Sequence, residues 1–311
     1  MQKSLLSDSP PFTMFIMLGF TMVSCFLFFM FIGILLAPPI LGVPVEDFMN
    51  IVEDGAMPHN LDVMRYLQVF HSVGMFLLPA FFAAYLFSKN TFSYLGLLQG
   101  ASFKWFAATF LLMFAAIPCI NLLVEFNKMI FFPEKLAVVE EHLKRLEENA
   151  RQMTLLFLNV DNAGAMFFNI FMMAMLPAIG EELIFRGLLH KIFVKWTGSI
   201  HAAIIVTGFL FSLMHLQFYG FFPRWVLGVI FGYMMVWSGS IWLPIFAHFL
   251  NNAAIVCVSY LIHKGTLSEK IEDYGTNAAD IPVIIAATSI CAAIMWMMWR
   301  KWKAKYNYTL Y

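Results

Sequence analysis

Long apolar runs alternate with short polar segments along most of this chain. A helix of about 20 apolar residues crosses the hydrocarbon core of a bilayer. Eight runs are long enough to do so: 12–37, 66–87, 104–124, 164–189, 199–219, 222–238, 241–262 and 281–299. Very short turns join the fourth to the seventh run, so these helices are expected to pack as antiparallel neighbours. The pattern predicts an all-α fold, a polytopic membrane bundle of about eight transmembrane helices that forms a single domain over residues 1–311.

A charged segment at 125–160 interrupts the apolar pattern between the third and fourth runs. Its residues 133–157 are expected to form an amphipathic helix, because charges cover one face and apolar residues recur at i, i+3/i+4 spacing at Leu136, Val139, Leu143 and Leu146. We interpret this helix as packed on the membrane surface or on the mouth of the bundle. A role in substrate gating is the alternative.

Composition supports a membrane protein. Of the 311 residues 61% are hydrophobic and 12% are charged, whereas about 25% charged residues is usual for soluble domains. The formal net charge is zero and no long basic tract is present, so nucleic-acid binding is not expected. The four cysteines all lie in apolar runs and form no C-x-x-C pair: Cys25, Cys119, Cys257 and Cys291. This pattern indicates packing residues rather than a disulfide or zinc framework.

The charges also predict an orientation. The first run is longer than a signal-peptide core and ends in Pro38-Pro39, so we expect an uncleaved first span. The loop that follows it is acidic, with Glu46, Asp47, Glu53, Asp54 and Asp62. Basic residues fall on the opposite side, at Lys89, Lys104, Arg186, Lys191, Lys195 and in the tail 299–306. Basic residues concentrate in cytoplasmic loops, so both termini are predicted to be cytoplasmic. The segment 125–160, with both signs of charge, fits this orientation least well.

Several polar side chains are stranded inside the apolar runs. The fourth run holds Glu181, Glu182 and Arg186, the fifth holds His215, and the seventh holds His248 and Asn252. Ionisable residues inside a membrane are costly and mark functional sites or paired charges.

Helical geometry separates the two glutamates. Glu182 and Arg186 are at i, i+4 and are expected to pair, whereas Glu181 is rotated by about 100° and stays free. His248 and Asn252 are also at i, i+4 and project together. With the run boundaries above, Glu181 lies in the cytoplasmic half of its span and His215 in the outer half of its own. The two meet only if the fourth helix is longer, or the fifth starts deeper, than drawn.

This set of residues suits hydrolysis by activated water. Glu181, desolvated beside a second carboxylate, is predicted to be the general base, with His215 holding the water. His248 and Asn252 can donate hydrogen bonds to a developing oxyanion.

Alternatives remain open on the residues alone. Ser212 is a weak candidate nucleophile, because no acid orients its neighbour His215. Two histidines and a glutamate are also a zinc ligand set, although H-E-x-x-H is absent and Asn252 is a poor zinc ligand. The same groups also occur in the proton relays of transporters and as hydrogen bonds between helices. We assign no role to the remaining histidines near the span ends, which are His71, His190, His201 and His263.

Three blocks resemble the CAAX protease and bacteriocin-processing family of intramembrane proteases, also called the abortive-infection family. Its pattern E-E-x-x-x-R, F-x-x-x-H and H-x-x-x-N stands here as Glu181-Glu182-x-x-x-Arg186, Phe211-x-x-x-His215 and His248-x-x-x-Asn252. The resemblance covers residues 160–262, which would be the catalytic core.

The resemblance implies an eight-helix bundle with a cavity open to the cytosolic side. It implies that Glu181 and His215 activate water, that His248 and Asn252 form the oxyanion hole, and that Glu182, Arg186 and Phe211 support them. That mechanism needs no cofactor, and zinc is the weaker alternative.

The expected function is intramembrane endopeptidase activity in a bacterial inner membrane. The expected partners are the lipid bilayer and a peptide or protein substrate at the membrane, either lipidated or bacteriocin-like. The alternatives are a non-proteolytic immunity or partner-binding protein of the same fold, or a small-molecule transporter.

Overall fold

Helices form every regular element of the part of the chain that the structure describes. This computed structural model describes residues 4–46, 48, 61–130, 132–271 and 274–307. Seven helical spans are long and apolar enough to cross a membrane: Pro11–Leu41, Leu61–Phe87, Phe103–Lys128, Ala163–Thr197, Phe218–Ser238, Trp242–His263 and Ile281–Ala304. The apolar helix α11, Ile200–Leu213, is shorter. The predicted fold class, an all-α polytopic membrane bundle, is confirmed.

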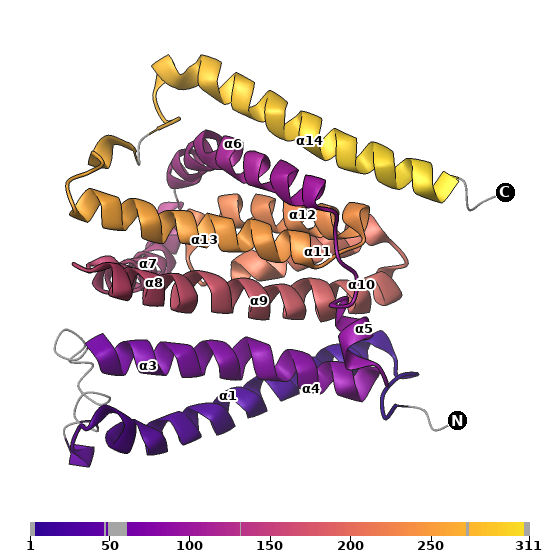
Figure 1. Ribbon diagram of the computed structural model, residues 1–311, viewed down its shortest axis with the longest axis horizontal. Coiled ribbons are helices and arrows are strands. Elements are labelled where there is room, and N and C mark those ends of the chain that lie inside the picture. The colour runs from indigo at the N-terminus through magenta and orange to yellow at the C-terminus, as the bar shows by residue number, and fades with distance from the viewer. Residues whose placement is uncertain (1–3, 47, 49–60, 131, 272–273, 308–311) are drawn as a thin grey trace.

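The bundle is layered, and both termini lie at one end of it (Figure 1). Helix α1 (Pro11–Leu41) packs on the span formed by α3 (Leu61–Ser72) and α4 (Leu78–Phe87). On the opposite side, α14 (Ile281–Asn307) packs on α6 (Phe103–Lys128). Between these two layers lie the helices that carry the predicted site: α8 (Ala163–Asn169), α9 (Leu176–Glu182), α10 (His190–Thr197), α11, α12 (Phe221–Ser238) and α13 (Trp242–His263).

Two spans change from α to π geometry within their length. The segment Val73–Leu77 joins α3 to α4, while Ile170–Met175 and Leu183–Leu189 flank α9. A π segment shifts the register of the side chains that follow it, and such segments are common at functional sites. Here they bracket Glu181 and Glu182.

The fourth span is longer than the run 164–189 predicts. It continues through α10 to Thr197, for 35 residues in all, and ends where Gly198 takes a left-handed φ of 67°. Its charged residues do not end the helix, because Lys191 donates to the backbone oxygen of Tyr94 and Lys195 to that of Ser9. Glu181 therefore lies near the middle of its span.

The fifth span is shorter than predicted. Helix α11 ends at Leu213, so the prediction of a helix over 199–219 is wrong at its C-terminal end. The chain turns at Met214 and His215, and Leu216 has a left-handed φ of 52°. His215 therefore lies in a turn rather than on a helix. The longer fourth span and the shorter fifth together remove the mismatch in depth between Glu181 and His215.

The charged segment forms the expected helix. A 3-10 turn at Glu134–Leu136 leads into α7, Ala137–Leu158. Helix α7 contacts α3, α8, α13 and the 3-10 turn Phe218–Gly220, and a Glu147 carboxylate oxygen accepts a hydrogen bond from the Tyr219 backbone at 3.1 Å. It therefore packs on the end of the bundle that is opposite the termini (Figure 1). Of the acidic residues predicted to lie outside, Asp47, Glu53 and Asp54 are beyond the described residues.

Candidate active site

A buried ion pair joins Glu182 to Arg186. Their side chains are 0% and 1% exposed, and Arg186 Nη1 lies 2.7 Å from Glu182 Oε1. The other terminal nitrogen, Nη2, donates to the backbone oxygen of Gly228 on α12 at 2.8 Å. The guanidinium also lies 5.0 Å from the ring centre of Phe211 and 5.5 Å from that of Phe231. Arg186 thus ties the fourth span to α11 and α12 by charge, hydrogen bonds and cation–π contact.

His248 lies between the two glutamates. Its Nδ1 is 3.0 Å from Glu182 Oε1, and its Nε2 is 3.9 Å from Glu181 Oε2. The first distance is a hydrogen bond and the second is too long for one. The ring is also enclosed by Phe211 and Phe231, with ring centres 5.5 and 5.7 Å away. Glu182 therefore binds both Arg186 and His248, whereas sequence reasoning assigned it to Arg186 alone. Spacing within one helix carries no information on a partner from α13.

Glu181 and His215 line one cavity of about 180 Å³. Its walls come from three parts of the fold, at Gln68, His71, Ser72, Phe76, Pro177, Glu181, Phe185, Met214 and His215. His215 Nδ1 is 2.9 Å from the Phe211 backbone oxygen. A carbonyl oxygen only accepts, so Nδ1 must carry the hydrogen, and in the neutral ring Nε2 is left as an acceptor. The structure thus brings Glu181 together with a histidine acceptor.

Asn252 lies on α13 but is not among the residues that line this cavity. Its amide nitrogen is 3.3 Å from the Met173 backbone oxygen, and its side-chain oxygen accepts from Asn251 at 3.2 Å. A carboxamide has two N–H donors, so one hydrogen of Asn252 is left after the bond to Met173. Asn252 connects α13 to the π segment Ile170–Met175 that precedes α9.

Sequence reasoning missed three polar residues of the cavity, Gln68, His71 and Ser72. We placed His71 near a span end because its apolar run begins at residue 66, but helix α3 begins at Leu61 and carries His71 well inside the bundle. Its Nδ1 is buried and has no hydrogen-bond partner among the described residues. A hydropathy pattern does not detect the start of a span whose first turn contains polar residues. No signal in the sequence therefore pointed to His71.

A zinc site would need several ligand side chains grouped around one point. Across the described part of the chain, no three side chains of His, Cys, Asp or Glu are grouped so that they could hold a metal ion. His248 Nδ1 is hydrogen-bonded to Glu182 Oε1 at 3.0 Å, and His248 is not among the residues that line the cavity of Glu181 and His215.

Comparison with known proteins gives matches over the part of the chain that carries these residues. Residues 163–254 match the family model described as Type II CAAX prenyl endopeptidase Rce1-like. A stretch of 93 residues, 28% of this chain, is 34% identical to the sporulation-killing factor biosynthesis protein SkfC of Bacillus subtilis (strain 168) and covers 18% of that protein. A stretch of 96 residues, 29% of this chain, is 27% identical to the uncharacterized protein YpbD of the same strain and covers 44% of it. No solved structure gives a significant match.

The resemblance predicted from the three motifs is therefore confirmed. The matched region runs from the start of α8 into α13 and contains Glu181, Glu182, Arg186, His215, His248 and Asn252. The matches span less than half of the length of the curated relatives. The chain is an integral membrane protein, and its residues 163–254 are similar to the Rce1-like family.

Proposed function

We propose that this chain is an intramembrane endopeptidase in which Glu181 activates water. The observation that carries the proposal is the division between the two glutamates. Glu182 is held by Arg186 and His248, whereas Glu181 lines a cavity with His215, and its Oε2 has no hydrogen-bond partner among the described residues. A carboxylate that is largely enclosed, faces a cavity and keeps an oxygen without a hydrogen-bond partner is suited to act on a small molecule such as water.

The reaction follows from these positions. Glu181 takes a proton from water while the water oxygen attacks the carbonyl carbon of the peptide bond. The C–N bond then breaks as Glu181 returns that proton to the leaving nitrogen, so one water is consumed and an acid and an amine are formed. His215 accepts a hydrogen bond from the same water at Nε2. A positioned base of this kind contributes about 10²–10⁴ to the rate.

His248 and Asn252 are the proposed donors to the oxyanion. Because Nδ1 of His248 donates to Glu182, Nε2 can also donate only when both ring nitrogens carry hydrogen. In that state the charges of Glu181, Glu182, Arg186 and His248 sum to zero, which lowers the cost of burying them in an apolar bundle. Removing one oxyanion donor typically costs about 10²–10³ in rate.

The direction from which substrate enters is a separate proposal. Basic residues gather at the end of the bundle that holds the termini, which favours cytoplasmic termini. The turn that carries His215 leads into the 3-10 turn Phe218–Gly220, which contacts α7 at the opposite end. Cytoplasmic termini would therefore put the turn with His215 at the outer end of the bundle, whereas the family resemblance implies a cavity that opens to the cytosol. We propose that substrate enters at the end of the bundle that α7 covers.

The substrate is proposed here only as a class. One relative is named as a sporulation-killing factor biosynthesis protein. We therefore propose a peptide processed at the membrane as the substrate class. The alternative is an immunity or partner-binding protein that keeps the fold without cleavage.

The test compares peptide fragments in the membranes of cells that carry the wild-type chain or Glu181→Gln. We expect fragments dependent on the wild type to fall by at least about 10²-fold in the variant, as expected for loss of a general base. Glu141→Gln is the matched control, since Glu141 is 71% exposed on α7 and makes only a 3.9 Å contact with Arg145.

Unchanged fragments in a folded Glu181→Gln protein would contradict the proposal. A measurement with a chelator on the purified wild type tests metal dependence separately, and full activity in its presence is the expected result.

A further inference from the structure

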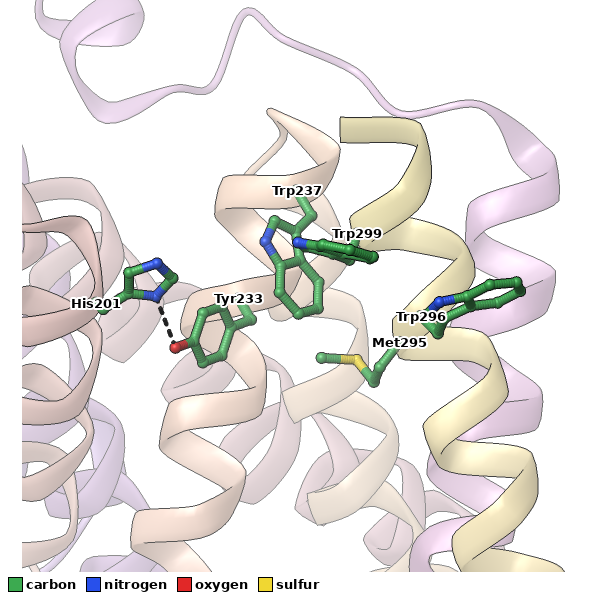
Figure 2. Close-up of a pocket in the computed structure, with 6 residues that line it drawn as sticks. All are labelled: His201, Tyr233, Trp237, Met295, Trp296 and Trp299. Atoms are coloured by element: carbon green, nitrogen blue, oxygen red, sulfur yellow. Dashed lines mark hydrogen bonds between the residues drawn. The ribbon is translucent and has the colours of Figure 1, made fainter. Parts of the chain in front are cut away.

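A second pocket lies on the other side of the bundle, at the end that holds the termini. It is a groove of about 400 Å³ between α11, α12 and α14, lined by His201, Tyr233, Trp237, Met295, Trp296 and Trp299 (Figure 2). This volume lies within the range of about 300–1,000 Å³ that is usual for ligand sites. None of the six residues belongs to the cavity of the candidate active site.

The groove has an apolar wall and a polar floor. Trp237 projects from α12, Met295, Trp296 and Trp299 project from α14, and Trp296 is 52% exposed (Figure 2). The Tyr233 hydroxyl and His201 Nδ1 form a hydrogen bond of 2.9 Å within it. Tryptophan and tyrosine gather at the level of the lipid headgroups in membrane proteins. The make-up of the groove is therefore typical of the depth where acyl chains meet headgroups.

Two cations lie against tryptophans of the groove, and a third lies nearby on the same helix. The guanidinium of Arg300 lies 4.9 Å from the ring centre of Trp296, and Lys303 Nζ lies 5.1 Å from that of Trp299. Lys301 Nζ lies 5.1 Å from the ring centre of Trp105 on the neighbouring helix α6. Among the described residues no carboxylate forms an ion pair with any of these three cations. Their charge is available to a partner from outside the chain.

We infer that this groove binds an anionic glycerophospholipid. One acyl chain would lie along the tryptophans between α12 and α14, and the phosphate would lie against Arg300 and Lys303. The Tyr233–His201 pair would meet the ester region. Basic pockets between transmembrane helices bind anionic headgroups in this way. A zwitterionic lipid fits the apolar wall equally well but loses the net attraction to the rim, so the groove is expected to discriminate by headgroup charge.

The test is native mass spectrometry of the purified full-length chain with phosphatidylglycerol or phosphatidylcholine of identical acyl chains. We expect retention of phosphatidylglycerol over phosphatidylcholine, and loss of that preference in the double variant Arg300→Gln, Lys303→Gln. Each basic residue near an anionic lipid contributes about fivefold to binding, so two give up to about 25-fold. The matched control is Lys264→Gln, Lys270→Gln, which removes two exposed cations from the opposite end of the bundle.

A variant that keeps all the cations separates the groove from the basic tail. Met295→Trp fills the groove between α12 and α14, and we expect it to lower phosphatidylglycerol retention by at least about fivefold. Equal retention of both lipids by the wild type, or an equal loss in the control, would overturn the inference. Full retention by Met295→Trp would show that the basic tail alone binds the lipid. A dimer of the chain without bound lipid would show that a second copy occupies this face.

Discussion

Replacing Arg186 by methionine is predicted to destabilise the fold strongly. The substitution keeps the apolar stem of the side chain but removes the guanidinium from Glu182 Oε1 at 2.7 Å and from the Gly228 oxygen at 2.8 Å. Glu182 is 0% exposed. The carboxylate would keep only the hydrogen bond from His248, because its other oxygen, Oε2, has no partner among the described residues.

The size of the effect follows from the burial of the pair. Removing one partner of a fully buried ion pair leaves an uncompensated charge and costs about 3–5 kcal/mol. Since about 1.4 kcal/mol corresponds to a factor of ten, the folding equilibrium should shift by roughly two to three and a half powers of ten. Arg186→Lys keeps the positive charge but replaces the planar guanidinium by a single ammonium group. The ammonium cannot donate to both Glu182 and the Gly228 oxygen in the same geometry, so an intermediate loss of stability is expected.

The assay is a double-mutant cycle of reversible unfolding in mixed micelles, followed by circular dichroism. It compares wild type, Arg186→Met, Glu182→Gln and the double variant. Replacing both charges removes the stranded carboxylate, so the double variant should be more stable than Arg186→Met alone.

A loss of less than about 1 kcal/mol in Arg186→Met would refute this reasoning, since exposed pairs contribute that little. A double variant no more stable than Arg186→Met would refute it as well, because the stranded charge would then not be the cause.

Two further predictions concern the packing around the site. Gly228→Ala should lower stability by about 1–3 kcal/mol in thermal unfolding, because its Cβ would lie 2.9 Å from the Cα of Gly208, a backbone atom that cannot rotate away. Gly19→Ala is the matched control, with no atom within 4 Å of the added Cβ, and a loss as large as that of Gly228→Ala would contradict the packing argument. Asn127→Leu should cost about 1–3 kcal/mol for each of two buried groups left unpaired, since Asn127 bonds the Phe218 oxygen and the Phe222 nitrogen at 2.8 Å. The variant should also reduce any cleavage that depends on Glu181, because Phe218 and Phe222 follow the turn that carries His215. An unchanged rate and stability would show that the bonds of Asn127 do not position His215.

The length of the apolar runs and the spacing of polar residues within them predicted the structure most reliably. The spans appear where the runs predict them, and Glu182 and Arg186 pair as their i, i+4 spacing indicates. Their roles in catalysis stay predictions. The errors lie at span ends, where Lys191 and Lys195 find backbone acceptors and remain helical, and where α11 ends before His215.

The sequence by itself determined the class of the protein, the helical spans, the pairing within the fourth span and the family resemblance. These depend on hydrophobic transfer and on helical periodicity, which act locally along the chain. Only the tertiary structure decided that His248 binds Glu182, that His71 lines the cavity of Glu181, and that tryptophans from α12 and α14 form a basic-rimmed groove. Such contacts join helices that are distant in the sequence, and their partners are selected by packing and by the need to neutralise buried charge.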